Sequence, residues 1–432
     1  MVGVFSPLDE ELQLVPGSLT PHLAEHLVHL GTWMPSGRAC TELQRFTGVR
    51  LSEATARRVT ERAGAAYVTV QTEQAATIRE ELPAVPEGPP LQQVSVDGAM
   101  VPLLNGVWAE VKTLAVGTVG DPVWDGGHWQ AHTQELSYFS RMTDHRTFAD
   151  LALVELHRRG TERAGVVCAV VDGAEWAQSF IDLHRSDAVR ILDFGHAAEY
   201  VARAGEACLG AGTTRYQSWL QPQLQALKHE DPEQVLQALR DLRAPPQRAE
   251  DEQPPTAGAV EVVEESLAYL EKRVAQIQYA SFGAKGYPIG SGIVESAHNL
   301  VMESRLKGGG MHWAPEHVDP MLALRTIACS DRWEEARPQI VRQLRVEAQG
   351  CRRPLQQAED VMPAEGSESG EQAEKEESPQ ESSPLVASSE ERDAAAQAPR
   401  ERWRPAPDHP WRHWSLKFGR GSRDRSTATA EM

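Results

Sequence analysis

The stretch Gly165-Val166-Val167-Cys168-Ala169-Val170-Val171-Asp172-Gly173 is the most apolar predicted strand of the chain. A short apolar run without polar interruption is typical of a β-strand that is covered on both faces, and the Asp-Gly pair marks its end. A second apolar segment, residues 189–192, is followed by Asp193. Covered strands require helices packed on the faces of a sheet, so these segments indicate an α/β fold with a mixed sheet.

The sequence around these strands changes repeatedly between the strand period and the helix period. Residues 94–96 are predicted to form a strand that ends in the turn Asp97-Gly98, and residues 107–119 alternate well enough for another strand. Helical periodicity predicts helices at residues 148–159, 215–229, 232–243, 259–279 and 293–306, with a further helix beginning after Pro315.

Composition divides the chain into four parts. We expect a helical module over residues 1–79, a Pro-rich linker over 80–92, and an α/β domain over 93–350 with a helical insertion at about 197–287. Residues 351–432 are poor in apolar residues, first acidic and then basic, and are predicted to be a disordered tail.

The 432 residues carry a net charge of −19, which argues against nucleic acid as a partner. About half of that charge lies at residues 359–393, which contain twelve acidic and two basic residues. The rest is only mildly acidic and leaves room for a local basic patch. No run of about 18 apolar residues and no secretory leader is present, so we expect a cytoplasmic protein without a membrane partner. Five widely spaced cysteines argue against a zinc site.

The N-terminal module reads as three short helices over residues 19–64. Gly48 suits the end of the second helix, Ser52 suits the N-cap of the third, and we expect the third helix to end before Gly64. This layout matches a helix-turn-helix, whose outer face can contact phosphates; the alternative is an ordinary helical hairpin with a solvated face. The arginines on the outer face of the third helix are Arg57, Arg58 and Arg62.

Three acidic residues stand at the ends of predicted elements. Asp97 and Asp172 each follow a strand and precede a glycine, and Glu295 begins a helix after a glycine-rich turn. Carboxylates at one edge of a sheet can converge, and three of them can hold two divalent cations for phosphodiester chemistry. Each residue also has a structural alternative. Asp97 and Asp172 would then belong only to hairpin turns, and Glu295 would be only a first-turn acidic residue that the helix dipole favours.

The segment Asp193-Phe194-Gly195-His196 adds a fourth feature after the strand at residues 189–192. In a functional interpretation, His196 orients a substrate or scissile phosphate near the three carboxylates. The alternative, which the residues alone favour, is that Asp193 caps the following helix and His196 is an ordinary first-turn residue.

A basic, glycine-rich segment follows Glu295 closely. On an ideal helix Glu295 and Arg305 share one face, and His298 and Met302 lie between them on that face. Arg305 and Lys307 would then place positive charge beside a DNA backbone near the carboxylate. The alternative is a basic helix end that leads into a flexible glycine loop.

Together these motifs resemble those of bacterial insertion-sequence DDE transposases, most closely the ISKra-type group, which is similar to the mutator-like enzymes. The resemblance spans about residues 5–333, and its last motif is the most specific. It is carried by Val94-Ser-Val-Asp97-Gly98, by Val170-Val-Asp172-Gly-Ala-Glu-Trp176, by Asp193-Phe-Gly-His196, and by Pro288-Ile-Gly-Ser-Gly-Ile-Val-Glu295-Ser followed by Arg305-Leu-Lys-Gly-Gly-Gly-Met-His-Trp313.

The resemblance implies an RNase H-like catalytic domain with a helical insertion between its fifth strand and the Glu-bearing helix. It implies Asp97, Asp172 and Glu295 as ligands of two Mg²⁺ ions, for which Mn²⁺ can substitute, and Asp193 and His196 match its accessory motif. The implied activity is cleavage of a DNA strand at the end of a bacterial element, followed by attack of the freed 3′-hydroxyl on target DNA. Two ends must meet, so we expect at least a dimer on DNA.

Two other interpretations stay open. One is a catalytically silent DNA-binding product of a truncated element, and the other is an RNase H-like nuclease without strand transfer. Members of the group often carry a Cys-rich zinc-binding segment ahead of a stretch like Phe5-Ser-Pro-Leu-Asp-Glu10, and this sequence begins with that stretch. We therefore expect an N-terminally truncated chain or one from an interrupted element.

Overall fold

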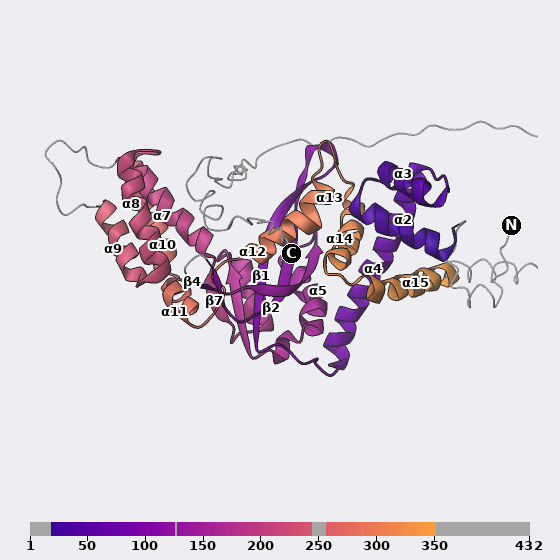
Figure 1. Ribbon diagram of the computed structural model, residues 1–432, viewed down its shortest axis with the longest axis horizontal. Coiled ribbons are helices and arrows are strands. Elements are labelled where there is room, and N and C mark those ends of the chain that lie inside the picture. Colours follow the sequence, from indigo (N-terminus) through magenta and orange to yellow (C-terminus); the bar gives the residue numbers. More distant parts are fainter. Residues whose placement is uncertain (1–18, 126–127, 244–255, 351–432) are drawn as a thin grey trace, which may run out of the picture. The chain divides into compact units, whose positions relative to one another are not determined.

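The computed structural model describes residues 19–125, 128–243 and 256–350, whose centre is a five-stranded mixed sheet (Figure 1). Its strand order is β5-β2-β1-β6-β7. Strand β2 pairs antiparallel with both β5 and β1. Strand β6 pairs parallel with β1, and β7 pairs parallel with β6. A separate ribbon pairs β3 (Val123–Asp125) with β4 (His128–Gln130). The sheet strands are β1 (Leu91–Pro102), β2 (Trp108–Val119), β5 (Thr133–Arg141), β6 (Val166–Val171) and β7 (Val189–Leu192).

Strand β6 is covered on both faces, as its apolar sequence predicts. On one face of the strand, side chains that include Val167 and Ala169 pack with α5 (His145–Arg158) and α6 (Glu175–His184). The other set, Cys168 and Val170, packs in a cluster with the helices that follow β7. The α/β fold expected from residues 165–173 is therefore confirmed.

Strand β1 does not end at Asp97-Gly98. The pairing with β2 continues through Asp97 opposite Thr113 as far as Pro102 opposite Trp108, and the turn lies at Leu104–Gly106. The predicted turn is wrong because the following residues, such as the fully buried Val101, belong to the covered face of the sheet and keep the ladder going.

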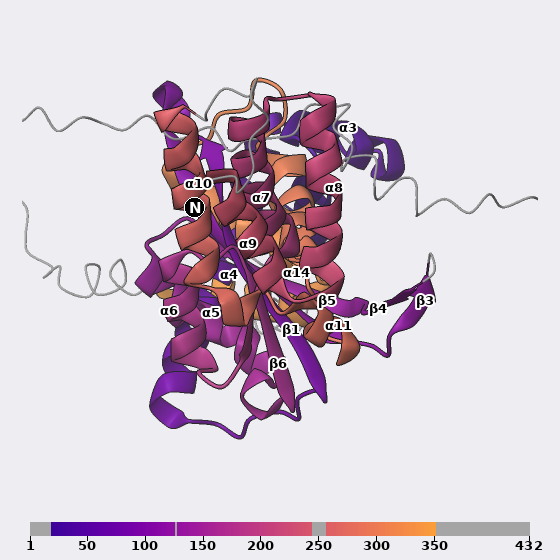
Figure 2. The same ribbon diagram turned by 90° about the vertical axis from the view of Figure 1, so that its left-hand side faces the viewer.

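The helices after β7 occupy the region of the predicted insertion and lie beside one another (Figure 2). Buried residues of these helices and of β7 share one apolar cluster. The chain then returns to the sheet through the short helix α12, a π-turn and the short helix α13, and it continues into the longer helices α14 and α15. The bounds are α7 (Phe194–Leu209), α8 (Thr214–His229), α9 (Pro232–Arg243), α10 (Ala257–Glu271), α11 (Tyr279–Ala284), α12 (Gly292–Ala297), a π-turn at His298–Glu303, α13 (Ser304–Leu306), α14 (Pro315–Cys329) and α15 (Trp333–Gly350), with single 3₁₀ turns at Thr161–Arg163 and Val274–Gln276.

The N-terminal module consists of α2 (Pro21–Trp33), α3 (Ser36–Thr47) and α4 (Glu53–Glu81). Gly48 ends α3 with φ of 73°, and the Ser52 hydroxyl caps α4 by accepting from Thr55 N–H, as predicted. The expected helix end at Gly64 is wrong, because α4 runs through it. A Cβ at Gly64 would clash with the backbone of Pro320, so this glycine permits close packing of α4 on α14.

None of the described helices is long and apolar enough to cross a membrane. The tail predicted at residues 351–432 and the first 18 residues lie outside the described part of the chain.

Candidate active site

Three aspartates lie on three adjacent segments of the sheet: Asp97 within β1, and Asp172 and Asp193 directly after β6 and β7. Strands β1 and β6 are parallel, and extending their register by three residues sets Asp97 level with Asp172. The β6–β7 register continues in the same way to Asp193, whose N–H donates to the Val171 carbonyl at 2.9 Å. Asp172 and Asp193 thus stand at the carboxyl ends of β6 and β7, beside Asp97 in the interior of β1.

Asp97 and Asp172 each hold one oxygen against the backbone. Asp97 Oδ1 accepts from Gly98 N–H at 2.7 Å, and Asp172 Oδ1 accepts from Ala174 N–H at 3.0 Å. Both side chains are partly open to solvent. A carboxylate has about four acceptor sites, so each can still bind a cation or a donor.

Asp193 is buried and ties two segments together. Its Oδ2 accepts from His196 N–H at 2.8 Å, which caps α7, and its Oδ1 accepts from Ser291 N–H at 2.6 Å. Phe194 N–H also donates to the carbonyl of Ile289 at 2.9 Å. The capping role is therefore confirmed, and the same carboxylate fixes the loop that precedes Glu295.

Helix α12 brings Glu295 toward this edge. Its side chain is exposed, but partial desolvation by its neighbours, then the charge of Asp193, and then that of Asp97 raise its pKa above the ordinary value. One turn further on, His298 Nδ1 lies 3.8 Å from Asp97 Oδ2. Helix α12 and the π-turn thus meet the central strand at Asp97. The role of His298 was not predicted, although its position three residues after Glu295 placed it on the same helix.

The Asp172 turn is held by the helical insertion. The Tyr269 hydroxyl donates to the Asp172 carbonyl at 2.5 Å, and Arg273 Nη2 donates to the Gly173 carbonyl at 2.8 Å. Gly173 has φ of 80°, and a Cβ there would lie 2.5 Å from the Tyr269 hydroxyl. Sequence analysis missed Tyr269 and Arg273 because about a hundred residues separate them from the turn.

His196 lies among aromatic rings beside this turn. Its imidazole is edge-on to Tyr200 and to Tyr269, with ring centroids 5.3 and 5.8 Å away. Its Nδ1 lies 3.7 Å from Glu199 Oε2, and about a third of the side chain is exposed. His196 is therefore accessible next to the segment that holds Asp172.

The donor set suits Mg²⁺ in its chemistry, because carboxylate oxygens are the ligands that this ion prefers. The charges of Asp193 and Asp97 raise the pKa of Glu295, and a bound cation would relieve this repulsion. Within the described ranges, however, no three His, Cys, Asp or Glu side chains stand close enough to form a metal centre. Coordination by Asp97, Asp172 and Glu295 would require these side chains to draw together.

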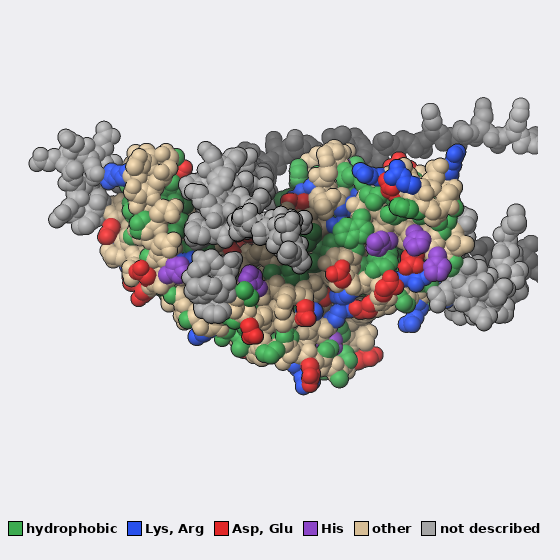
Figure 3. All heavy atoms as spheres, in the orientation of Figure 1, with side chains coloured by type: hydrophobic (Ala, Val, Ile, Leu, Met, Phe, Trp, Pro, Cys, Tyr) green, Lys and Arg blue, Asp and Glu red, His purple; other side chains and the backbone are tan. Residues whose placement is uncertain are grey.

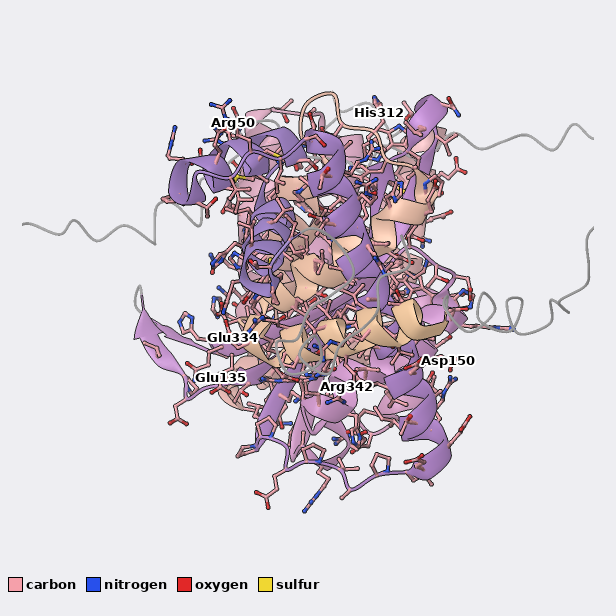
Figure 4. All side chains as sticks on the ribbon, turned by 90° about the vertical axis from the view of Figure 1, so that its right-hand side faces the viewer. Arg50, Glu135, Asp150, His312, Glu334 and Arg342 are labelled. Carbon is pink, nitrogen blue, oxygen red and sulfur yellow. The ribbon has the colours of Figure 1, made fainter. Side chains whose placement is uncertain are left out.

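The predicted phosphate-binding arginines of the N-terminal module are exposed. Lys and Arg side chains gather over α3 (Figure 3), and Arg50 lies at the connection between α3 and α4 (Figure 4). Arg57 Nε lies 3.9 Å from Glu61 Oε1, so one of these charges is partly offset. The exposed arginines on the first turns of α4 are Arg57, Arg58 and Arg62.

Arg305 does not face solvent, which corrects its expected contact with a DNA backbone. It is 5% exposed, its Nε donates to the Gly31 carbonyl at 3.2 Å, and its guanidinium lies over the Trp313 ring. Burial and the nearby Arg325 lower its pKa to about 10. Lys307 stays partly exposed and pairs with Glu303 at 3.0 Å.

Comparison with solved structures gives a distant likeness. No family model and no curated protein sequence matches the chain. A solved structure described as a Drosophila P element transposase strand transfer complex is similar with a TM-score of 0.36 and 12% sequence identity. That comparison covers 72% of this chain and 92% of the other.

Proposed function

We propose that the chain is a DNA transposase in which Asp97, Asp172 and Glu295 are the catalytic carboxylates. One observation carries the proposal: the β1–β6 register, continued past its last pair Val94–Ala169, aligns Asp97 with Asp172, and His298, three residues after Glu295, lies 3.8 Å from Asp97 Oδ2. Neighbouring carboxylates that raise the pKa of Glu295 do not help the protein to fold, which supports a role for this edge in binding cations or substrate.

The topology supports the same proposal. The sheet is antiparallel from β5 through β2 to β1, continues in parallel through β6 and β7, and is followed by helices α7 to α11 before α12. This order agrees with the RNase H-like domain and helical insertion that the motifs imply. The exposed arginines of α4 and Lys307 are the proposed contacts to the DNA backbone.

In the proposed mechanism, two bound Mg²⁺ ions would activate the attacking oxygen and stabilise the leaving oxygen of the phosphodiester. Asp97, Asp172 and Glu295 would hold them, and Mn²⁺ would substitute. Asp193 holds the loop that leads to Glu295 by accepting from Ser291 N–H, and His196, which lies beside Tyr269, would contact the substrate next to Asp172. Because cleavage of an element requires both ends, we propose a dimer or larger assembly on DNA, in the bacterial cytoplasm.

The test is a cleavage assay on plasmid DNA that carries the segments flanking the coding sequence, with Mg²⁺ or Mn²⁺. Wild type is compared with Glu295→Gln, which keeps size and removes charge. Metal-dependent nicking that is lost in the variant is the expected result. Binding without nicking by wild type would instead indicate a silent DNA-binding protein.

Product analysis separates transposition from simple hydrolysis. A transposase joins the freed 3′ end to target DNA, and the joined product is detected by sequencing across the junction. Nicked products without any junction would identify an RNase H-like nuclease and contradict the transposase proposal.

A further inference from the structure

The helix that carries Glu295 has an unusual spacing of buried residues. An α-helix turns by about 100° per residue, so twelve residues overshoot three full turns by about 120°. A straight helix with buried positions every fourth residue would therefore rotate its last buried pair toward solvent. The buried pairs are Ile293 and Val294, Ala297 and His298, Val301 and Met302, and Arg305 and Leu306.

A π-turn at residues 298–303 removes this drift. A π-turn places one extra residue in a helical turn, which rotates one half of the helix relative to the other by about 100°. The second half can then pack Met302 and Leu306 in the core while the first half directs Glu295 and His298 to Asp97. The π-turn also explains why Arg305 is not on the exposed face of Glu295.

Arg325 of α14 holds this π-turn from the side. A π-turn interrupts the usual i to i−4 hydrogen bonds, so its carbonyls need other donors. Arg325 Nε donates to the Val301 carbonyl at 3.3 Å, and Nη2 donates to Ser304 Oγ at 2.9 Å and also to the Leu300 carbonyl. One guanidinium thus donates to two carbonyls of the π-turn and to the hydroxyl of the residue that follows it.

The guanidinium is itself fixed on its other side. It is 1% exposed, stacks over the Trp33 ring at 4.3 Å, and its Nη1 donates to the Thr32 carbonyl at 3.4 Å. Thr32 and Trp33 are the last two residues of α2, where the helix dipole favours a cation. Arg325 therefore joins α14, the end of α2 and the π-turn.

We propose that Arg325 is a positioning residue: it holds the π-turn and thereby sets the direction from which Glu295 and His298 face Asp97. The expected effect on cleavage rests on the proposed function. The expected effect on structure, a change in how His298 faces Asp97, does not depend on it. Arg325 touches neither carboxylate and acts only through the helix.

The decisive variant is Arg325→Met, which keeps a long side chain and removes all of its donors. Arg325→Lys keeps the charge but loses the planar fork that reaches several acceptors at once. The matched control is Arg141→Met. Arg141 is also buried and donates to Gln71 and Ser140, away from the π-turn.

The geometric readout is the ring signal of His298 in full-length protein with ¹³C-labelled histidine, assigned by its loss in His298→Asn. We expect the signal to shift in Arg325→Met, to shift less in Arg325→Lys, and to stay in place in Arg141→Met. The catalytic readout is the cleavage rate at saturating DNA, which should fall at least about tenfold in Arg325→Met while the DNA Kd stays within about twofold.

An unmoved His298 signal in a folded Arg325→Met variant would overturn the proposal. If Arg325→Met does not fold, Arg325→Gln is tested in its place, since it keeps one amide nitrogen as a donor without the planar fork. A wild-type His298 signal and a wild-type cleavage rate in Arg325→Gln would then contradict the proposal. A shifted His298 signal together with no cleavage by wild type would keep Arg325 as a positioning residue and remove the transposase proposal instead.

Discussion

His298 Nδ1 lies 3.8 Å from Asp97 Oδ2, and this approach joins the Glu-bearing helix to the central strand of the sheet. Asp97 comes from a strand that the apolar pattern reveals, whereas His298 lies about two hundred residues further along the chain. The geometry of the proposed site thus depends on packing between α12 and β1 as much as on the carboxylates themselves.

Asp97→Asn tests the carboxylate on the central strand. If Asp97 binds the cations of phosphodiester cleavage, the amide should lower the cleavage rate by at least about a thousand-fold and leave DNA binding nearly unchanged. The measurement is nicking of plasmid DNA alongside a binding titration. Asp150→Asn, a change at an exposed aspartate paired with Arg79, is the control and should keep wild-type cleavage. Full activity in Asp97→Asn would contradict the assignment.

Gly173→Ala tests the turn after β6. Its φ of 80° disfavours a side chain, and the new Cβ would meet the Tyr269 hydroxyl and Arg273. We expect a loss of about 1–3 kcal/mol in the free energy of unfolding, measured by urea denaturation. Gly258→Ala is the control, because that helical position has open space around it and should be neutral or slightly stabilised. Equal stability of both variants would show that the turn tolerates a side chain.

The arginines of α4 are tested by one triple variant, in which Arg57, Arg58 and Arg62 become Gln. Phosphate contacts release counterions, so the variant should bind DNA more weakly and with a shallower dependence on salt. Each lost contact should lower the slope of log K against log salt by about 1. A change of the exposed Arg342 on α15 to Gln is the control (Figure 4). An unchanged slope in the triple variant would place the DNA contact elsewhere.

Asp144 gives a pH-dependent prediction that is independent of function. Its carboxylate caps α5, and bonds from the Thr147 hydroxyl and from the N–H groups of Thr147 and Arg146 lower its pKa to about 2. A lowered pKa means that this stabilisation is complete above the ordinary Asp value and is lost as the pH falls toward 2. The urea midpoint of Asp144→Ala should therefore lie below that of wild type at neutral pH and approach it in acid.

Asp144→Ser separates the cap from its charge. Serine also accepts a hydrogen bond at an N-cap but does not titrate in this range. The difference between Asp144→Ser and Asp144→Ala should stay constant as the pH falls. A constant difference between wild type and Asp144→Ala over the same range would show that the carboxylate charge contributes nothing.

The sequence predicted those parts of the fold that local pattern determines. Strand β7 and helix α9 have the predicted bounds because their apolar spacing needs no distant partner. Strand β5 was not predicted, since its buried Ser140 and Arg141 are polar. Thr113 and Gln71, from other elements, satisfy them only in the folded chain.

The same limit applies to the site. The motifs are the basis for proposing Asp97, Asp172 and Glu295, whereas Arg305 was placed on the wrong face because an ideal helix contains no π-turn. Gly64 was read as a helix end, although its role is close contact with Pro320. Such features depend on contacts with a distant part of the chain, and the local sequence pattern does not show which part that is.

The contact of Tyr269 and Arg273 with the Asp172 turn bears on how the chain can be shortened. The insertion lies between strand β7 and helix α12 in the chain, so a design for a shorter chain would consider removing it. Here its excision would also remove the two side chains that support Asp172. A fragment without the insertion would lose these two supports of the Asp172 turn, so any shortened chain meant to keep the proposed site should keep the insertion.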